Sequence, residues 1–191
     1  MRIRLARPSD NDELCALFRG ASFTREDLVS KKAPDSGFYE YPLTHSDIAM
    51  RTGNPPFSLV MEDRRNIIVY LLGYDKQFAS ERVALSEHTD PVIERFSRLP
   101  NAAVYLDQLF LQRGLPIFHA SLLMDTWDHI VQGEKIEFVV ASLPQGDWTN
   151  RSSLRFALDR GFSRKDKVNS LGVQLGVFSK PYLNLDEEFK L

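Results

Sequence analysis

The stretch from Val104 to Ile130 constrains the fold more than any other part of the chain. It opens with Val104–Leu111, an apolar and aromatic run of strand length, and breaks at Gln112-Arg113-Gly114. Apolar residues then recur at helical spacing, with Pro116 where a first helical turn tolerates proline. The stretch therefore predicts a strand, a tight turn and a helix that begins near Pro116. The apolar positions of this helix are Ile117, Ala120, Leu123, Met124, Trp127 and Ile130.

A strand, turn and helix in this order can bind an anion. The start of the helix directs free N–H groups and the positive end of the helix dipole at whatever lies beyond the strand. Proteins commonly hold phosphates in this way. An ordinary buried strand and helix without a ligand is the alternative interpretation, and this stretch alone leaves both open.

The next two segments extend the unit. Lys135–Leu143 reads as a second strand, which a helical crossover places parallel to the first. A helix with a polar start follows at Asn150, and Gly161 is the residue best suited to end it in a left-handed cap.

Other parts of the chain predict antiparallel pairing and one insertion. Met1–Ala6 alternates basic and apolar residues, and a helix with Ser9 and Asp12 as a capping box follows. Two β-rich runs flank a hairpin turn at 63–66, and a closing hairpin is expected to turn at Asn169-Ser170. Between the two hairpins, residues 76–103 are predicted to form a helical insertion. The remaining ranges are Phe57–Glu62 and Ile67–Tyr74 for the first hairpin, Asp90–Leu99 for the helix of the insertion and Leu171–Phe178 for the last strand.

Composition limits the class of protein and its partners. With 191 residues, of which 43% are hydrophobic, the chain suits one globular domain with a sizeable core. The net charge of -2 gives no general attraction to nucleic acid or to an acidic membrane surface. The single cysteine, Cys15, allows no intrachain disulfide, and no signal peptide or run of eighteen apolar residues occurs. We therefore expect a cytoplasmic protein that binds neither nucleic acid nor membrane.

Several kinds of enzyme are disfavoured by the absence of their motifs. The sequence has no Gly-x-Ser-x-Gly elbow, no P-loop and no Gly-x-Gly-x-x-Gly turn. Its four histidines lack the spacing of metal ligands, so we expect no metal site.

The order of strand, Arg113-Gly114 turn, helix, strand, Asn150-led helix and Gly161-Phe162 resembles the acyl-CoA-binding half of the GNAT superfamily of N-acetyltransferases. The opening Ile3–Asp10 is also similar to the start of many members. The resemblance implies a single α+β (α/β) domain over residues 1–191. In that domain, helices flank a mixed and mostly antiparallel central sheet, with a parallel βαβ unit at the acyl-CoA site.

The resemblance also implies a cofactor and a reaction. The cofactor would be acetyl-CoA or another acyl-CoA, and the acyl group would pass to an amine of a small molecule or a peptide. The strand around Leu109–Leu111 would run beside the pantetheine arm, the turn and helix start would face the phosphates, and Asn150 would lie near the arm. The implied cofactor-binding residues are Leu109, Phe110, Leu111, Arg113, Gly114, Leu115, Ile117, Phe118, His119 and Asn150.

Tyr105 and Asp107 are the candidate catalytic residues. They lie two apart on one strand and so share a face. If that face lines a cleft, Asp107 or a water that it holds could accept the proton of the amine; the alternative is a hydrogen-bonded residue where two strands separate. Tyr39 and Tyr41 are candidates for shaping the choice of acceptor, or for packing a loop onto the core.

Three residues differ from the family pattern and keep a second interpretation open. The family turn reads Arg-x-x-Gly-x-Gly/Ala, and laying its Arg on Arg113 puts Pro116 and Phe118 where small residues belong. Ala157 stands where many members carry the Tyr that reprotonates the thiolate. A GNAT-fold module that binds a ligand or partner without catalysis is therefore the alternative. A homodimer through the insertion helix or the closing hairpin also stays open, and the sequence specifies neither the acceptor nor the acyl chain length.

Overall fold

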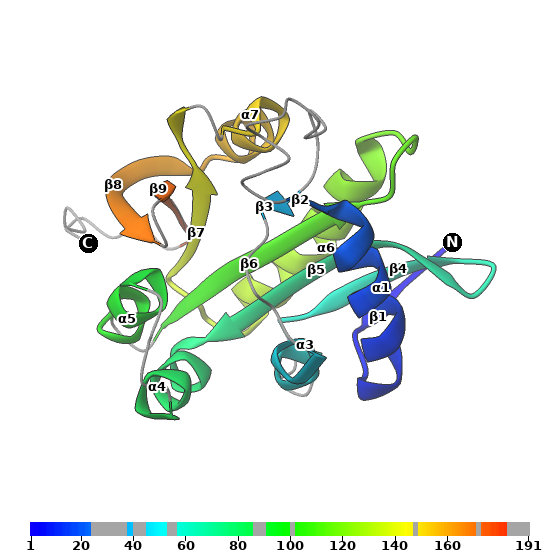
Figure 1. The fold of residues 1–191 in the computed structure, drawn as a ribbon, viewed down its shortest axis with the longest axis horizontal. Helices are drawn as coiled ribbons and strands as arrows, with labels where there is room; N and C mark the ends of the chain where they lie inside the picture. Colours follow the sequence, from blue (N-terminus) through cyan, green and yellow to red (C-terminus); the bar gives the residue numbers. More distant parts are fainter. Residues whose placement is uncertain are drawn as a thin grey trace. The chain divides into compact units, whose positions relative to one another are not determined.

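The computed structural model describes residues 1–23, 38–39, 45–52, 57–85, 91–99, 102–146, 149–170 and 173–182 (Figure 1). Its strands are β1 Arg2–Leu5, β2 Ser22–Phe23, β3 Phe38–Tyr39, β4 Leu59–Asp63, β5 Asn66–Asp75, β6 Ala103–Leu111, β7 Phe138–Pro144, β8 Ser163–Ser170 and β9 Val173–Pro181. Its helices are α1 Asn11–Ala21, α3 His45–Thr52, α4 Lys76–Leu85, α5 Pro91–Ser97, α6 Phe118–Gly133 and α7 Arg151–Asp159, with a short 3-10 turn at Pro8–Asp10.

Seven strands are hydrogen-bonded in the order β1-β4-β5-β6-β7-β9-β8, and β2 pairs with β3 separately. The pairs β1–β4, β4–β5, β7–β9 and β8–β9 are antiparallel, whereas β6 and β7 are parallel, as the helical crossover between them predicts. The expected α+β fold, with its mostly antiparallel sheet and one parallel βαβ unit, is confirmed.

The chain divides into two compact units. Unit 1 comprises Met1–Gly73 and Gln108–Ile130, and unit 2 comprises Tyr74–Asp107 and Val131–Leu191. The single domain predicted over residues 1–191 stays a prediction.

The hairpin of β4 and β5 forms the centre of unit 1. Its strands pair from Leu59 with Leu71 to Asp63 with Asn66, as the sequence predicts. Arg64 and Arg65 make the two-residue turn with φ of 49° and 74°, the left-handed geometry that such hairpin turns require. Helices α1 and α3 contribute to a core that includes Leu14, Phe18, Ile48, Val60, Tyr70, Leu72 and Phe110.

Helix α6 is anchored in unit 1 by a buried indole. Trp127 is fully buried, and its Nε1–H donates to the carbonyl oxygen of Phe57 at 3.0 Å. A buried Trp normally requires such a partner for its N–H. The helix begins at Phe118, two residues after Pro116, near which the sequence predicted its start. The Pro116 and Ile117 carbonyls accept the amides of His119 and Ser121.

In unit 2 the parallel ladder is short. β6 pairs with β7 only from Ala103 with Phe138 to Leu106 with Ala141, although both strands continue beyond these residues. β7 begins at Phe138 rather than at Lys135, because Lys135 has a φ of 57° and closes a turn after α6.

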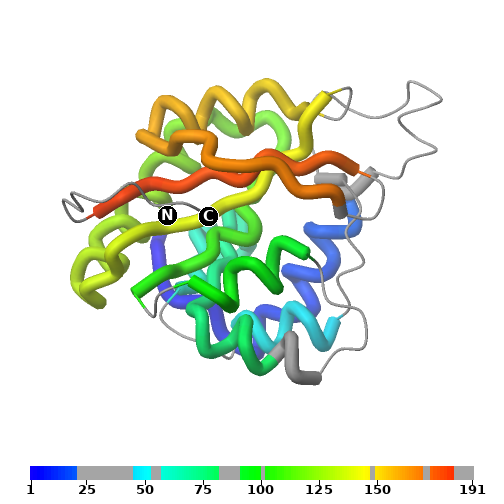
Figure 2. The backbone as a smooth tube through the Cα atoms, turned by 90° about the vertical axis from the view of Figure 1, so that its left-hand side faces the viewer, coloured from blue at the N-terminus to red at the C-terminus, as the bar shows by residue number. Residues whose placement is uncertain are grey.

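Helix α7 and the closing hairpin complete unit 2 (Figure 2). Asn150 caps α7 by accepting the N–H of Ser153 at 3.0 Å, and Gly161 ends it with a φ of 84°. The Phe162 and Gly161 amides then bond back to the carbonyls of the last turn, as in a Schellman cap. The hairpin does not turn at Asn169-Ser170 as predicted, because Asn169 pairs with Gln174 and Ser170 pairs with Val173. Residues 171–172 lie outside the described residues.

The described residues of the insertion include two helices, α4 and α5, where the sequence predicted one. The Asp75 carboxylate caps α4 by accepting the Phe78 N–H at 2.9 Å. α4 was missed because it lacks a clear apolar face in its sequence. The apolar side of α5 is buried within unit 2 at Val92, Ile93 and Phe96, as predicted.

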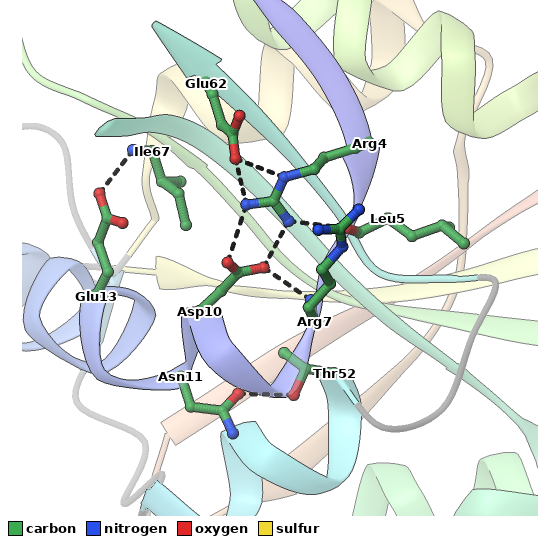
Figure 3. A network of polar contacts seen from close by, with 9 residues as sticks. All are labelled: Arg4, Leu5, Arg7, Asp10, Asn11, Glu13, Thr52, Glu62 and Ile67. Atoms are coloured by element: carbon green, nitrogen blue, oxygen red, sulfur yellow. Dashed lines mark hydrogen bonds and ion pairs between the residues drawn. The ribbon is translucent and has the colours of Figure 1, made fainter. Parts of the chain in front are cut away.

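A polar network ties β1 to the start of α1 in unit 1 (Figure 3). The Arg4 guanidinium donates to both carboxylate oxygens of Asp10, at 2.7 and 2.9 Å, and is also paired with Glu62. The Arg7 amide donates to Asp10 at 2.7 Å. The capping carboxylate is therefore Asp10 and not Asp12, which corrects the predicted capping box, because the chain enters the helix through a 3-10 turn.

This network predicts an acid-dependent stability. Burial alone raises the pKa of Asp10, but the bonds from Arg4 and from the Arg7 amide together lower it below its ordinary value. A carboxylate with a lowered pKa in the folded chain stabilises it above the unfolded pKa of about 3.9, and this stability is lost as the pH falls further. Asp10→Asn should cost about 2 to 3 kcal/mol at neutral pH, since it leaves Arg4 partly unpaired.

Urea unfolding between pH 7 and acid pH measures both effects. The Asp10→Asn variant should also lose part of the acid dependence. Asp63→Asn is the matched control, because Asp63 is half exposed and lies 3.7 Å from the N-terminal amine. Equal stabilities of the Asp10 variant and the unchanged chain at pH 7 would contradict a stabilising role for the network.

Candidate functional site

The second half of β6 is held firmly in unit 1. Phe110 is buried and stacks on Tyr70 with ring centroids 5.0 Å apart, and the Tyr70 hydroxyl donates to Gln108 Oε1 at 3.3 Å. Beyond the strand, the Gln112 amide donates to the carbonyl of Ile68 at 2.9 Å. The position where the chain leaves β6 is therefore fixed against β5.

Alternate residues of this strand segment have different surroundings. The side chains of Gln108 and Phe110 are buried, whereas Leu109 and Leu111 are only half-buried. Of the three strand residues predicted to bind cofactor, Phe110 therefore belongs to the core through its ring. The side chains of Leu109 and Leu111 lie on the opposite face of β6, which is only half-buried.

A tight turn follows at Gln112-Arg113-Gly114-Leu115. The Leu115 amide donates to the Gln112 carbonyl at 3.2 Å, and Gly114 has a φ of 87°. This φ at the third residue of a turn favours glycine strongly. Open space surrounds the position that a Cβ on Gly114 would occupy, so the backbone is uncovered there.

Several amides at the turn and at the start of α6 have no backbone partner among the described residues. The Pro116 carbonyl accepts from the His119 amide at 3.1 Å, and the Ile117 carbonyl accepts from the Ser121 amide at 3.0 Å. Over the described part of the chain, no backbone acceptor serves the N–H groups of Arg113, Gly114, Ile117 and Phe118. These four residues are among those that the sequence predicted to bind the cofactor, and that role stays a prediction.

Side chains around these amides are open to solvent. Arg113 and Gly114 are exposed, and Ile117 and Phe118 are 59% and 61% exposed. The ring of Phe118 meets that of its neighbour His119 edge-on, with centroids 5.9 Å apart. His119 Nδ1 lies 3.1 Å from the Pro116 carbonyl, so Nδ1 carries the hydrogen of this bond. The large side chain at Phe118 is therefore turned to the surface and does not occupy the core.

The arrangement fits an anion. Four unpartnered amides, an exposed guanidinium and the positive end of a helix dipole belong to one turn and its helix. Pro116 offers no N–H, so it removes one donor from this group but leaves the others.

In unit 2, Tyr105 lies in an aromatic cluster. It is 4% exposed, stacks on Tyr74 at a centroid distance of 5.1 Å and contacts Phe96 at 5.5 Å. Its hydroxyl lies 2.5 Å from the Ser142 hydroxyl on β7. Ser142 and Phe96 were not identified from the sequence, because nothing in their local pattern indicates that they meet Tyr105.

Asp107 and Asn150 are the other two predicted site residues of unit 2. Asp107 is half-buried and comes directly after the last residue of β6 that pairs with β7. Asn150 serves as the cap of α7. Tyr41 lies outside the described residues. For Tyr39 only the backbone is described, in β3.

The described residues contain neither a cluster of metal ligands nor a membrane-spanning helix. No group of three or more His, Cys, Asp or Glu side chains there is arranged to hold a metal ion. No helix in that part of the chain has the length and apolar character needed to cross a membrane.

Comparisons with known proteins identify the fold. No family model matches the sequence, and no curated protein matches it. Solved structures match over almost the whole chain. The ribosomal-protein-S18-alanine N-acetyltransferase of Escherichia coli aligns with a TM-score of 0.64 at 6% identity, covering 100% of this chain and 99% of that one.

Two archaeal proteins give similar values. Ard1 from Thermoplasma volcanium aligns with a TM-score of 0.63 at 14% identity, covering 96% of this chain and 98% of that one. The PaiA N-acetyltransferase from Thermoplasma acidophilum, solved in complex with coenzyme A, aligns with a TM-score of 0.60 at 13% identity, covering 95% and 98%. The chain therefore has the fold of the GNAT N-acetyltransferases.

Proposed function

We propose that this chain is an acyl-CoA-dependent N-acyltransferase that transfers an acyl group, in the first instance acetyl, to an amine of a small molecule or a peptide. The observation that carries the proposal is the set of unpartnered amides at Arg113, Gly114, Ile117 and Phe118. They lie at the strand, turn and helix of a fold shared with N-acetyltransferases, one of which was solved with coenzyme A.

The turn would hold the phosphates of the cofactor. Backbone amides that converge at a turn and a helix start favour phosphate oxygens without any particular side chain. Arg113 adds a mobile positive charge at the same place, and the absence of a side chain at Gly114 leaves room for close approach. Leu115 and His119 complete this part of the site.

The pantetheine arm would run beside Leu109–Leu111. Leu109 and Leu111 present half-buried apolar side chains, which suits an arm of mixed polarity. We also assign Asn150, which caps α7, to cofactor binding.

Of the two candidate catalytic residues, we propose Asp107 as the general base and assign buried Tyr105 a positioning role. Acyl-CoA supplies a thioester whose carbonyl carbon forms the new C–N bond and whose sulfur leaves as the thiolate. Asp107, or a water that it holds, would take the proton that the amine loses. The contact between the hydroxyls of Tyr105 and Ser142 would fix the position of β6 and so of Asp107, two residues further along the strand. Tyr39 and Tyr41 remain the candidates for the acceptor side.

A catalytically inactive GNAT-fold binding module is the second candidate. Ala157 favours it, since alanine has no group that could return a proton to a thiolate. Cofactor binding without transfer to any amine would support this second candidate.

The proposed setting is the cytoplasm. The support is the single cysteine, Cys15, which is buried and has a pKa raised by burial, as in a thiol that packs in a core. Such a chain needs no oxidising compartment to fold.

Calorimetry with acetyl-CoA tests cofactor binding. Arg113→Glu should weaken acetyl-CoA binding at least tenfold, because it replaces a charge-assisted contact, worth about 1.5 to 3 kcal/mol, with repulsion. Arg19→Glu is the matched control, since Arg19 is an exposed arginine on α1, and it should change the affinity less than twofold. The absence of heat with acetyl-CoA and with longer acyl-CoAs would refute cofactor binding by the unchanged chain.

Steady-state kinetics with acetyl-CoA and a panel of amines tests the catalytic role. Asp107→Asn should lower kcat by about a hundredfold or more, as the loss of a general base does, with little change in acetyl-CoA affinity. Asp159→Asn removes a carboxylate that is 71% exposed on α7 and should leave kcat unchanged. A fully active Asp107→Asn variant would rule out Asp107 as the base.

A further inference from the structure

The start of α6 carries an exposed apolar group that folding does not explain. Ile117, Phe118 and Leu122 are 59%, 61% and 38% exposed. Phe118 and Leu122 lie four residues apart, so they share one face of the helix. An exposed aromatic ring next to unpartnered amides is a surface suited to a ligand with both a flat ring and an anionic group.

Phe118 lies at the first residue of α6. Its own amide is one of the four that have no backbone acceptor in the described part of the chain, so its ring belongs to the same residue that would meet a phosphate. The edge contact with His119 supports the ring on one side and leaves most of its surface open. A preformed aromatic surface of this kind costs little conformational entropy when a base stacks on it.

We propose that Phe118 is a stacking platform for the adenine of acyl-CoA and so determines affinity for the nucleotide end of the cofactor. This inference rests on the proposed function. In acyl-CoA the adenosine is joined directly to the phosphates that the turn would hold, so the base can reach a ring at the start of the helix. The residue that departs most from the family's small-residue pattern thereby contributes a contact to the cofactor.

Any nucleic-acid base can stack on an aromatic ring, and stacking requires no hydrogen bonds. Alanine substitution of a stacking residue typically weakens binding about 5- to 150-fold, from about 1 to 3 kcal/mol per base. We expect about tenfold here, because one face of an exposed ring is used. Phe118→Trp should retain or improve affinity, since a larger ring stacks at least as well.

The test uses the full chain and etheno-CoA, the fluorescent analogue whose modified base reports its surroundings. Titration of the unchanged chain should change the emission of the base and give an affinity close to that of CoA. Phe118→Ala should lose both the emission change and about tenfold in affinity, whereas Phe118→Trp should restore both. Leu122→Ala is the matched control: it shortens an exposed apolar side chain on the same helix face and should change the affinity less than twofold.

Each other outcome overturns the inference. An unchanged affinity in Phe118→Ala, or a loss of affinity that Phe118→Trp does not restore, rejects stacking while leaving cofactor binding intact. No binding of CoA by the unchanged chain rejects the proposed function and the inference together. If light scattering gives a lower mass for Phe118→Ala than for the unchanged chain, and the affinity for CoA is the same, the ring contacts a second copy of the chain and not the cofactor.

Discussion

The tie between the end of β6 and β5 is the constraint on which the candidate site depends. The Gln112 amide bonds to Ile68, and the turn that follows requires the left-handed φ of Gly114. At the other end of the segment, Trp127 holds α6 through the Phe57 carbonyl. The chain is thus held just before α6 and again at Trp127 within it, so the first amides of the helix have a defined direction.

Backbone recognition would allow the proposed site to tolerate residues that depart from the GNAT pattern. Phosphate binding by amides depends on the path of the main chain more than on side chains. Pro116 removes one donor but uses its carbonyl to accept the His119 amide, which organises the start of the helix. Phe118 directs its ring to solvent, so the amide of the same residue stays accessible. Sequence departure at these positions is thus compatible with the same kind of site.

Periodicity and turn residues were sufficient to predict most of the fold. The strand before Arg113, the Gly114 turn and the Gly161 cap follow from local rules of backbone geometry, and all three are present. Local rules could not predict α4, whose apolar residues lack a single face, or the true start of α6. They also could not identify Ser142 as the neighbour of Tyr105, because that pairing depends on the register of two distant strands. Tyr41 lies outside the residues that the structure describes.

The most direct measurement of the central claim is the change in backbone amide resonances when acetyl-CoA is added to the isotope-labelled chain. The account predicts the largest shifts at the amides of Arg113, Gly114, Ile117 and Phe118. The amides of Arg64 and Arg65, in the other tight turn of unit 1, should not move. Saturating acetyl-CoA that leaves the first four amides unshifted, or that shifts those of the β4–β5 turn instead, would contradict the account.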